Sequence, residues 1–200
     1  MVKRSQTSKN TAVRAHNRRE QIVEAAARLF AQHGFDATKM RDIADATGIL
    51  VGSIYYHFES KEELFFAGYS AGMEYVIAAV DRAIEGETRP LEKLEKAIIA
   101  HCEALNAERA LLNIMLPTVP ETLGEYRDKI NRMRDEYESR FKAILEDLEI
   151  IEPLDPRLFL INLLGTMNYT RFWFRPGRRS AEDVGREIFK VYSLGLRPKS

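Results

Sequence analysis

The amino-acid sequence predicts an all-α fold of about nine helices, arranged as a small N-terminal domain and a larger C-terminal domain. Two observations predict this fold class. Apolar residues recur three and four positions apart along most of the 200-residue chain, which is the spacing of one helix face. Glycine, proline and helix-capping residues then divide these stretches from one another.

The composition argues against a membrane protein and against a disulfide-stabilised one. Hydrophobic residues make up 45% of the chain, as in an ordinary globular protein, and no apolar run approaches the roughly 20 residues of a membrane span. The polar, basic N-terminus lacks the apolar core of a secretory signal. Because Cys102 is the only cysteine, no internal disulfide can form, and we expect a cytoplasmic protein with no membrane partner.

Charge is distributed unevenly, although the 30 basic and 30 acidic residues cancel. Residues 1–19 carry six cations and no acid, residues 74–155 are rich in acids, and cations dominate again from Pro156. The neutral total does not exclude a nucleic-acid partner, because the relevant field is local. We expect residues 1–13 to form a mobile basic arm, which is either a terminus without a role or an arm that adds phosphate or minor-groove contacts.

The stretch from Lys39 to Phe58 contains two short helical patterns separated by a glycine. Gly48 ends the first, because the turn between the helices needs a residue that tolerates positive φ. The second places Ile54 and Phe58 on its inner face, at i and i+4. With a preceding helix over about 17–33, these elements predict a three-helix unit containing a helix-turn-helix, whose second helix lies in the DNA major groove.

The same residues resemble the DNA-binding half of the TetR family of transcriptional regulators. The resemblance covers about residues 17–66 and implies a DNA-binding domain over 14–60 that recognises double-stranded operator DNA. It is carried by the segments Leu29–Phe30, Gly34–Phe35, Thr38, Arg41–Ala44, Gly48–Ile49, Gly52–Phe58 and Ser60–Leu64.

The motif and the chemistry of its outer face predict a set of DNA contacts. For two members the sequence leaves an alternative open. Arg41 either approaches the DNA or pairs with Asp45 one turn on, and Tyr55 either faces the DNA or packs inward. The candidate DNA-binding residues are Arg41, Val51, Gly52, Ser53, Tyr55, Tyr56, His57 and Lys61.

The chain departs from the family pattern at two helix starts. Lys39 stands where a hydroxyl residue is usual, so Thr38 is the candidate cap of the first short helix. Leu50-Val51 stands where Ser-Lys is common, which removes a capping oxygen and a phosphate-binding cation. Val51 is therefore expected to weaken non-specific contact or to meet a thymine methyl group.

A long connecting helix is predicted over residues 61–84. Ser60 and Glu63 form a capping box, in which each side chain bonds to the backbone of the other residue. Lys61 then lies at the positive end of this helix, where amides and ammonium together favour a phosphate.

Residues 85–200 are predicted to form a ligand-binding and dimerisation domain. Helices are expected from Pro90 to about 108, over 111–116, from Pro120 to about 148, from Pro156 to about 174, and from 180 to about 196. Asp155 and the Ser180–Asp183 pair are expected to cap the last two helices, and Gly165 is expected to allow the close approach of a neighbour. His101 and Cys102 are adjacent and point about 100° apart on a helix, without further cysteine partners, so we predict no metal site.

The segment from Asn168 to Ser180 combines arginines with aromatic residues and the only tryptophan. It resembles the corresponding turn of TetR-type repressors of fatty-acid and sterol catabolism, which implies an acyl-CoA effector. Arginine forks and an aromatic platform suit phosphates and adenine, and an apolar tunnel suits an acyl chain. The alternative is that the cations stabilise a helix end and the aromatics belong to a core or dimer interface. The candidate ligand-binding residues are Met115, Met133, Tyr137, Phe141, Met167, Asn168, Arg171, Trp173 and Arg175.

The sequence therefore predicts a ligand-responsive transcriptional regulator, in which a small hydrophobic effector releases a repressor from its operator. The resemblance implies a homodimer joined by the last two helices. No motif for catalysis is present, so we expect neither an enzyme nor a bound cofactor. A regulator of an unconjugated hydrophobic ligand and a helical dimeric interaction protein are the alternatives. The sequence does not decide whether the effector releases or promotes DNA binding.

Overall fold

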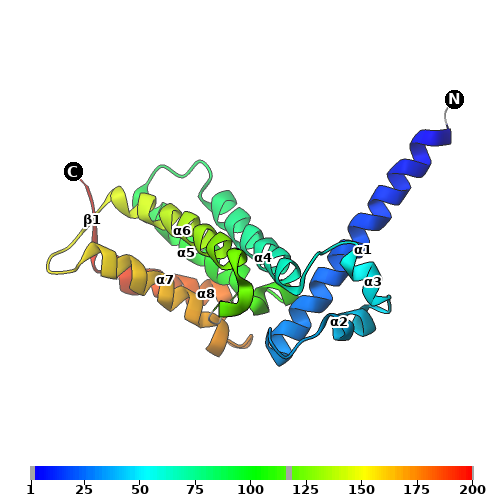
Figure 1. Ribbon diagram of the computed structural model, residues 1–200. Helices are drawn as coiled ribbons and strands as arrows, with labels where there is room; N and C mark the ends of the chain where they lie inside the picture. The colour runs from blue at the N-terminus through cyan, green and yellow to red at the C-terminus, as the bar shows by residue number, and fades with distance from the viewer. Residues whose placement is uncertain (1–2, 116–118, 200) are drawn as a thin grey trace. The chain divides into compact units, whose positions relative to one another are not determined.

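A computed structural model describes residues 3–115 and 119–199 (Figure 1). This part of the chain contains eight α-helices, two short 3-10 helices and two three-residue strands. Its contacts divide it into an N-terminal unit, Met1–Ala71 with Arg109–Asp128, and a C-terminal unit, Gly72–Glu108 with Lys129–Ser200. The all-α prediction is confirmed, with a small sheet that the sequence analysis did not predict. The contacts place residues 109–128 in the N-terminal unit, whereas the sequence had grouped them with 85–200.

The first helix, α1, spans Lys3–His33 and begins well before the expected start near residue 17. Residues 3–13, expected to be a mobile arm, are helical in the structure, and no glycine or proline in this stretch stops a helix from extending. Its buried stripe includes Ile22, Ala26 and Phe30. Gly34, at φ 83°, ends the helix.

The helix-turn-helix consists of α2, Met40–Thr47, and α3, Val51–Tyr55. Gly48 adopts the left-handed conformation between them, and its N–H donates to the carbonyls of Ala44 and Asp45 in the last turn of α2. The expected cap from Thr38 is wrong, because the Thr38 hydroxyl donates to the Gly34 carbonyl at 2.7 Å. The N-cap is Lys39, whose amide donates to Asp42 Oδ2 at 2.8 Å.

The long helix α4 spans Lys61–Ile84, as predicted, and Phe65 on its first turns joins an aromatic cluster. The rings of Phe30, Phe35 and Phe65 have centroids 5.3–5.5 Å apart, pair by pair. All three are buried, so α1, the segment after it and α4 share one core.

The short helix η1, Ala110–Ile114, packs against α1 within the N-terminal unit. The expected α-helix over 111–116 is therefore a 3-10 helix, and residues 116–118 lie outside the described part of the chain. The next predicted helix, from 120 to 148, is divided as well. Gly124, at φ 55°, separates η2, Glu121–Leu123, from α6, Glu125–Glu146.

The C-terminal unit contains α5, Pro90–Leu105, with α7, Pro156–Trp173, and α8, Ala181–Ser193 (Figure 1). The predicted caps of α7 and α8 are confirmed. Asp155 accepts from the Leu158 amide at 2.8 Å, and Ser180 and Asp183 bond reciprocally at 2.8 and 3.0 Å.

A two-stranded antiparallel sheet replaces the expected ends of two helices. Strand β1, Leu148–Ile150, pairs with β2, Leu196–Pro198, so that Ile150 opposes Leu196. The apolar residues that suggested further helical turns are the buried ends of these strands. Among the described residues, no helix is both long enough and apolar enough to cross a membrane.

Helices α5 and α8 pack closely together at a glycine. A Cβ atom on Gly185 would lie 2.8 Å from Ile99 Cα, which is backbone and cannot move aside. The close approach expected at Gly165 is not found within the described chain, where a Cβ at that position meets nothing within 4 Å.

We predict that Gly185→Ala lowers the free energy of unfolding by about 1–3 kcal/mol, because the added methyl group must push α5 and α8 apart. Guanidinium unfolding monitored by circular dichroism measures this. Gly177→Ala is the matched control, since its Cβ would meet only one atom, at 3.9 Å. Equal stability of the two variants would contradict the close packing.

Candidate DNA interface and ligand site

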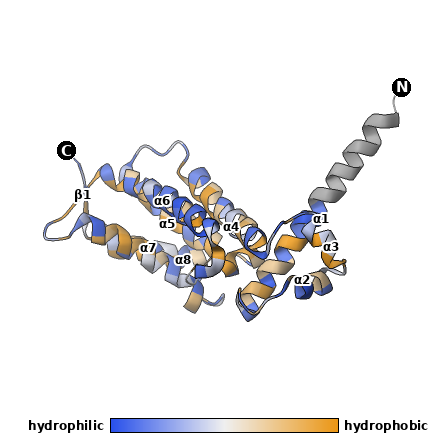
Figure 2. Ribbon diagram, in the orientation of Figure 1, coloured by the Kyte–Doolittle hydropathy of each residue, from blue (hydrophilic) through white to orange (hydrophobic). Residues whose placement is uncertain are grey.

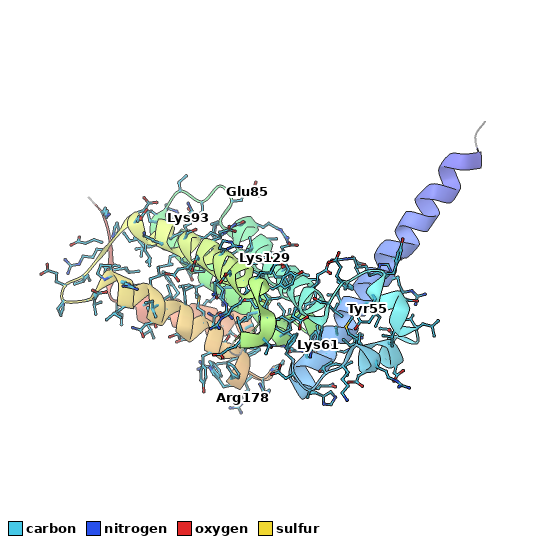
Figure 3. The ribbon with its side chains drawn as sticks, viewed as in Figure 1. Tyr55, Lys61, Glu85, Lys93, Lys129 and Arg178 are labelled. Atoms are coloured by element: carbon cyan, nitrogen blue, oxygen red, sulfur yellow. The ribbon has the colours of Figure 1, made fainter. Side chains whose placement is uncertain are left out.

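The outer face of α3 is formed by side chains that the helix leaves in solvent. Ile54 is fully buried and anchors the helix, whereas Tyr55 and Tyr56 are 51% and 86% exposed. Ser53 and Gly52 are also exposed. Figure 3 labels Tyr55 on this face. The structure therefore resolves the alternative for Tyr55 in favour of an outward-facing ring.

A concave surface of about 310 Å³ joins this face to α1. It is lined by Arg18 together with Ile49, Ser53, Tyr56 and His57. A guanidinium and two hydroxyl groups around one hollow provide the donors that a phosphate oxygen accepts. Arg18 was not among the predicted site residues. In the sequence, Arg18 is only one of six cations within residues 1–19, and nothing in that pattern indicates which of them lies next to α3.

The start of α3 lacks a side-chain cap, whereas two aromatic rings pack together at its end. At its start, Leu50 forms no side-chain bond to the helix, which confirms the missing capping oxygen. This leucine is 80% exposed, and Val51 beside it is half-buried. At the other end, the His57 ring packs edge-to-face on Tyr56, with centroids 5.3 Å apart. Both rings therefore support each other on the exposed face.

The guanidinium of Arg41 is exposed in the first turn of α2. Within the described residues it forms no ion pair with Asp45, which was the alternative to a DNA contact. Its charge therefore remains available to a phosphate.

The ammonium group of Lys61 is held by the loop that follows α1. Its Nζ atom donates to the carbonyl of Phe35 at 2.8 Å and to that of Thr38 at 3.0 Å, and it lies 4.2 Å from the Phe35 ring centroid. Lys61, labelled in Figure 3, thus has donors committed inside the N-terminal unit. This favours a structural role over the phosphate contact that the helix position had suggested.

The capping box at the start of α4 forms only in part. Ser60 accepts from the Glu63 amide at 3.0 Å, as predicted. The Glu63 carboxylate bonds the amide of Glu59 at 2.6 Å rather than that of Ser60. The cap is therefore extended by one residue toward the reading helix.

We predict that Lys61→Met destabilises the protein by about 1.5–3 kcal/mol, because the loop carbonyls lose a charged donor. Arg28→Met is the control. That arginine is exposed, with its partner Glu24 at 3.9 Å, so its loss should cost no more than about 0.5 kcal/mol. Chemical unfolding of both variants measures the difference, and a Lys61 variant as stable as the control would refute the structural role.

The interior of the C-terminal unit brings together three of the predicted ligand-binding residues. Tyr137, Phe141 and Met167 are buried there, and the first two pack edge-to-face at 5.6 Å. Met133 on the same face of α6 is half-buried. Met115 belongs to the N-terminal unit instead and is half-buried after η1.

A buried histidine outside the predicted ligand-binding residues lies in the same interior. His101 Nδ1 is 2.6 Å from the Tyr137 hydroxyl. Burial lowers the pKa of His101 to about 4, partly opposed by Asn168, so the ring is neutral near pH 7. Burial also raises the pKa of Cys102 to about 12, which makes that thiol unreactive.

The remaining predicted residues lie toward the end of α7. Asn168, Trp173 and Arg175 are exposed, while Arg171 is half-buried. Burial, and then the nearby Arg175 charge, lowers the pKa of Arg171. The positive charges of Arg171 and Arg175 repel each other where Arg171 is partly shielded from solvent, and a bound anionic group would reduce this repulsion.

Helices α7 and α8 expose an apolar surface, which we call the α7–α8 stripe. It consists of Leu158, Ile161, Tyr169, Phe172, Val191 and Leu194. The α7 members recur at helical spacing around Gly165. The ribbon coloured by hydropathy shows apolar residues along α7 (Figure 2).

These features define a helix-turn-helix DNA-binding protein with a separate helical domain. A model of the bacterial regulatory proteins of the tetR family matches residues 22–67. A model of the tetracyclin repressor-like C-terminal domain matches residues 87–196, which is more than half of the chain.

Three known proteins show the same similarity over almost the whole chain. The transcriptional repressor KstR2 of Mycobacterium tuberculosis is 28% identical, over 92% of this chain and 96% of its own. The TetR family regulator PfmR of Thermus thermophilus is 31% identical with a TM-score of 0.75, over 88% and 98% of the two chains. AibR, solved in complex with isovaleryl coenzyme A and operator DNA, is 26% identical with a TM-score of 0.72, over 91% and 100%.

The chain belongs to the TetR family of bacterial regulatory proteins, and it is a DNA-binding transcriptional regulator. The resemblance drawn from residues 17–66 is thereby confirmed.

Proposed function

We propose that this protein is a cytoplasmic, homodimeric repressor that leaves its operator when an acyl-CoA thioester binds the C-terminal unit. The observation that carries the proposal is that the same unit holds a buried apolar interior and an exposed end of α7 rich in arginine and aromatic residues. AibR, which shares this fold, was solved with a CoA thioester and operator DNA. We infer no catalytic activity, since the relatives are regulators.

The proposed DNA contacts come from α1, α2 and α3. Arg41 supplies an exposed guanidinium group on α2, while the guanidinium of Arg18 and the hydroxyl groups of Ser53 and Tyr56 line the hollow between α1 and α3. Such contacts bind mainly the phosphate backbone, so affinity should fall steeply with salt. The remaining predicted contacts, from Val51, Gly52, Tyr55 and His57, would face base edges in the major groove.

The proposed effector contacts divide by chemistry. Phosphates of CoA would meet Arg171 and Arg175, and the Trp173 ring would stack on adenine. The acyl chain would enter the apolar interior around Phe141 and Met167, with Met133 and Tyr137 beside it. Asn168 lies between the two regions on α7.

The proposed dimer forms through the α7–α8 stripe. A monomer that exposed so many large apolar side chains on two neighbouring helices would be prone to associate. A two-fold dimer buries the same stripe on both copies and provides two reading heads for two operator half-sites.

The proposed mechanism is a population shift. Helix α4 begins in the N-terminal unit at Lys61 and continues without a break into the C-terminal unit to Ile84. A ligand that prefers one arrangement of the C-terminal unit can therefore change how often the helix-turn-helix domains of the dimer are positioned to bind DNA. It weakens DNA binding only by as much as its affinities for the two states differ.

We predict that Ile161→Glu converts the dimer to a monomer, because a carboxylate at the centre of the α7–α8 stripe would be buried without a partner. Sedimentation velocity measures the change. Arg157→Glu, at an exposed position of α7 outside the stripe, reverses a charge and should leave the dimer intact. A dimeric Ile161 variant would refute the interface.

We predict that a long-chain acyl-CoA releases the protein from the duplex upstream of its own gene, whereas free CoA does not. Fluorescence anisotropy measures the release, and the DNA affinity alone should fall linearly with the logarithm of salt concentration. Tyr56→Ala should lower the affinity about tenfold through lost contacts to the duplex. Tight binding that no thioester weakens would retain the regulator and rule out this effector class, and an unconjugated fatty acid that acts alone would replace it.

A further inference from the structure

The imidazole of His101 holds one buried nitrogen without a hydrogen-bond partner. The side chain is 2% exposed, and Nδ1 is 2.6 Å from the hydroxyl of Tyr137. Nε2 is the buried side-chain polar atom that no group in the described part of the chain satisfies. Asn168 approaches the ring from α7 but lacks the geometry of a hydrogen bond to Nε2. Because buried polar groups are nearly always paired, this atom points to a missing partner.

The pairing with Tyr137 defines which kind of partner is missing. If the tyrosine hydroxyl donates to Nδ1, the ring keeps its proton on Nε2, and one donor remains unsatisfied. If Nδ1 donates instead, both the tyrosine proton and the bare Nε2 lack partners. The first arrangement leaves fewer buried groups unpaired, so Nε2–H is a donor that awaits an acceptor.

The surroundings of the ring keep it rigid and neutral. It stacks on Tyr137 with centroids 5.7 Å apart and meets the edge of Phe141 at 6.3 Å. Met167 and Cys102 are fully buried in the same unit. A neutral donor fixed between aromatic rings suits an uncharged acceptor on an otherwise apolar molecule.

We infer that the Nε2–H of His101 is a specificity-determining contact of the effector site and binds the carbonyl oxygen of an acyl thioester. This inference rests on the function proposed above and assigns a contact that distinguishes a thioester from an apolar chain without a carbonyl group.

The arrangement of α7 agrees with this assignment. Asn168, whose side chain interacts with the His101 ring, is exposed on α7. Arg171 follows at i+3 and therefore lies on the same side of α7, and Arg175 comes two residues after the helix ends at Trp173. If the phosphates of the ligand contact these arginines, its thioester and acyl chain can extend along the same side of α7 toward His101.

A matched pair of ligands tests the contact. Dodecanoyl-CoA carries the thioester carbonyl, and S-dodecyl-CoA has a methylene group in its place. We expect the wild-type protein to bind the thioester about tenfold more tightly, measured through the fluorescence of Trp173, the only tryptophan. His101→Phe should bind both compounds with equal affinity, because the donor is gone.

Two further variants separate the contact from the packing of the ring. The amide of His101→Gln can reach the position of Nε2 and should restore part of the preference. His101→Asn reaches only the position of Nδ1 and should not. Operator binding and the unfolding curve of each variant are recorded alongside.

The outcomes distinguish this inference from the proposed function. Equal wild-type affinity for the two compounds, or a tenfold preference that persists in the Phe and Asn variants, would overturn the role of His101 and leave the effector class in place. If intact wild-type protein binds operator but neither compound, the effector class fails, and the inference fails with it.

Discussion

The packing of Phe30, Phe35 and Phe65 is the constraint on which the DNA-binding unit depends. These rings join α1, the loop after it and α4 into one core. The Lys61 ammonium then holds the carbonyls of the same loop, and Ile54 anchors α3 from the other side. With the interior occupied in this way, the hydroxyl groups and rings of α3 have only the outer face available, which is where a reading helix needs them.

The C-terminal unit is tightly packed at one helix contact, but it also has an exposed apolar surface and a buried nitrogen without a hydrogen-bond partner. At Gly185, α5 and α8 approach so closely that no side chain fits. The outer stripe of α7 and α8 remains apolar and exposed, and the buried Nε2 of His101 lacks an acceptor. In the proposed function, a second copy covers the apolar stripe and an effector accepts from His101, so both features are satisfied.

Some expectations from the sequence were wrong for physical reasons. The apolar residues Leu148 and Leu196 continued the helical spacing, but they form strands, because β1 and β2 pair across a long sequence separation. The helix expected from residue 120 divides at Gly124, whose positive φ a continuous helix cannot contain. Within the described chain the close approach occurs at Gly185 and not at Gly165, since only the position of the neighbouring helix determines which glycine is needed.

The sequence by itself determined what depends on neighbours along the chain: the caps at Asp155 and Ser180, the turn at Gly48, the family motif, and the apolar faces of the helices. Those features follow from bonds within one turn of backbone. Only the tertiary structure decided that Lys61 is committed to the loop after α1, that Arg18 joins the face of α3, and that His101 meets Tyr137. Each of these depends on residues brought together from distant parts of the chain, and no local pattern encodes such a distance.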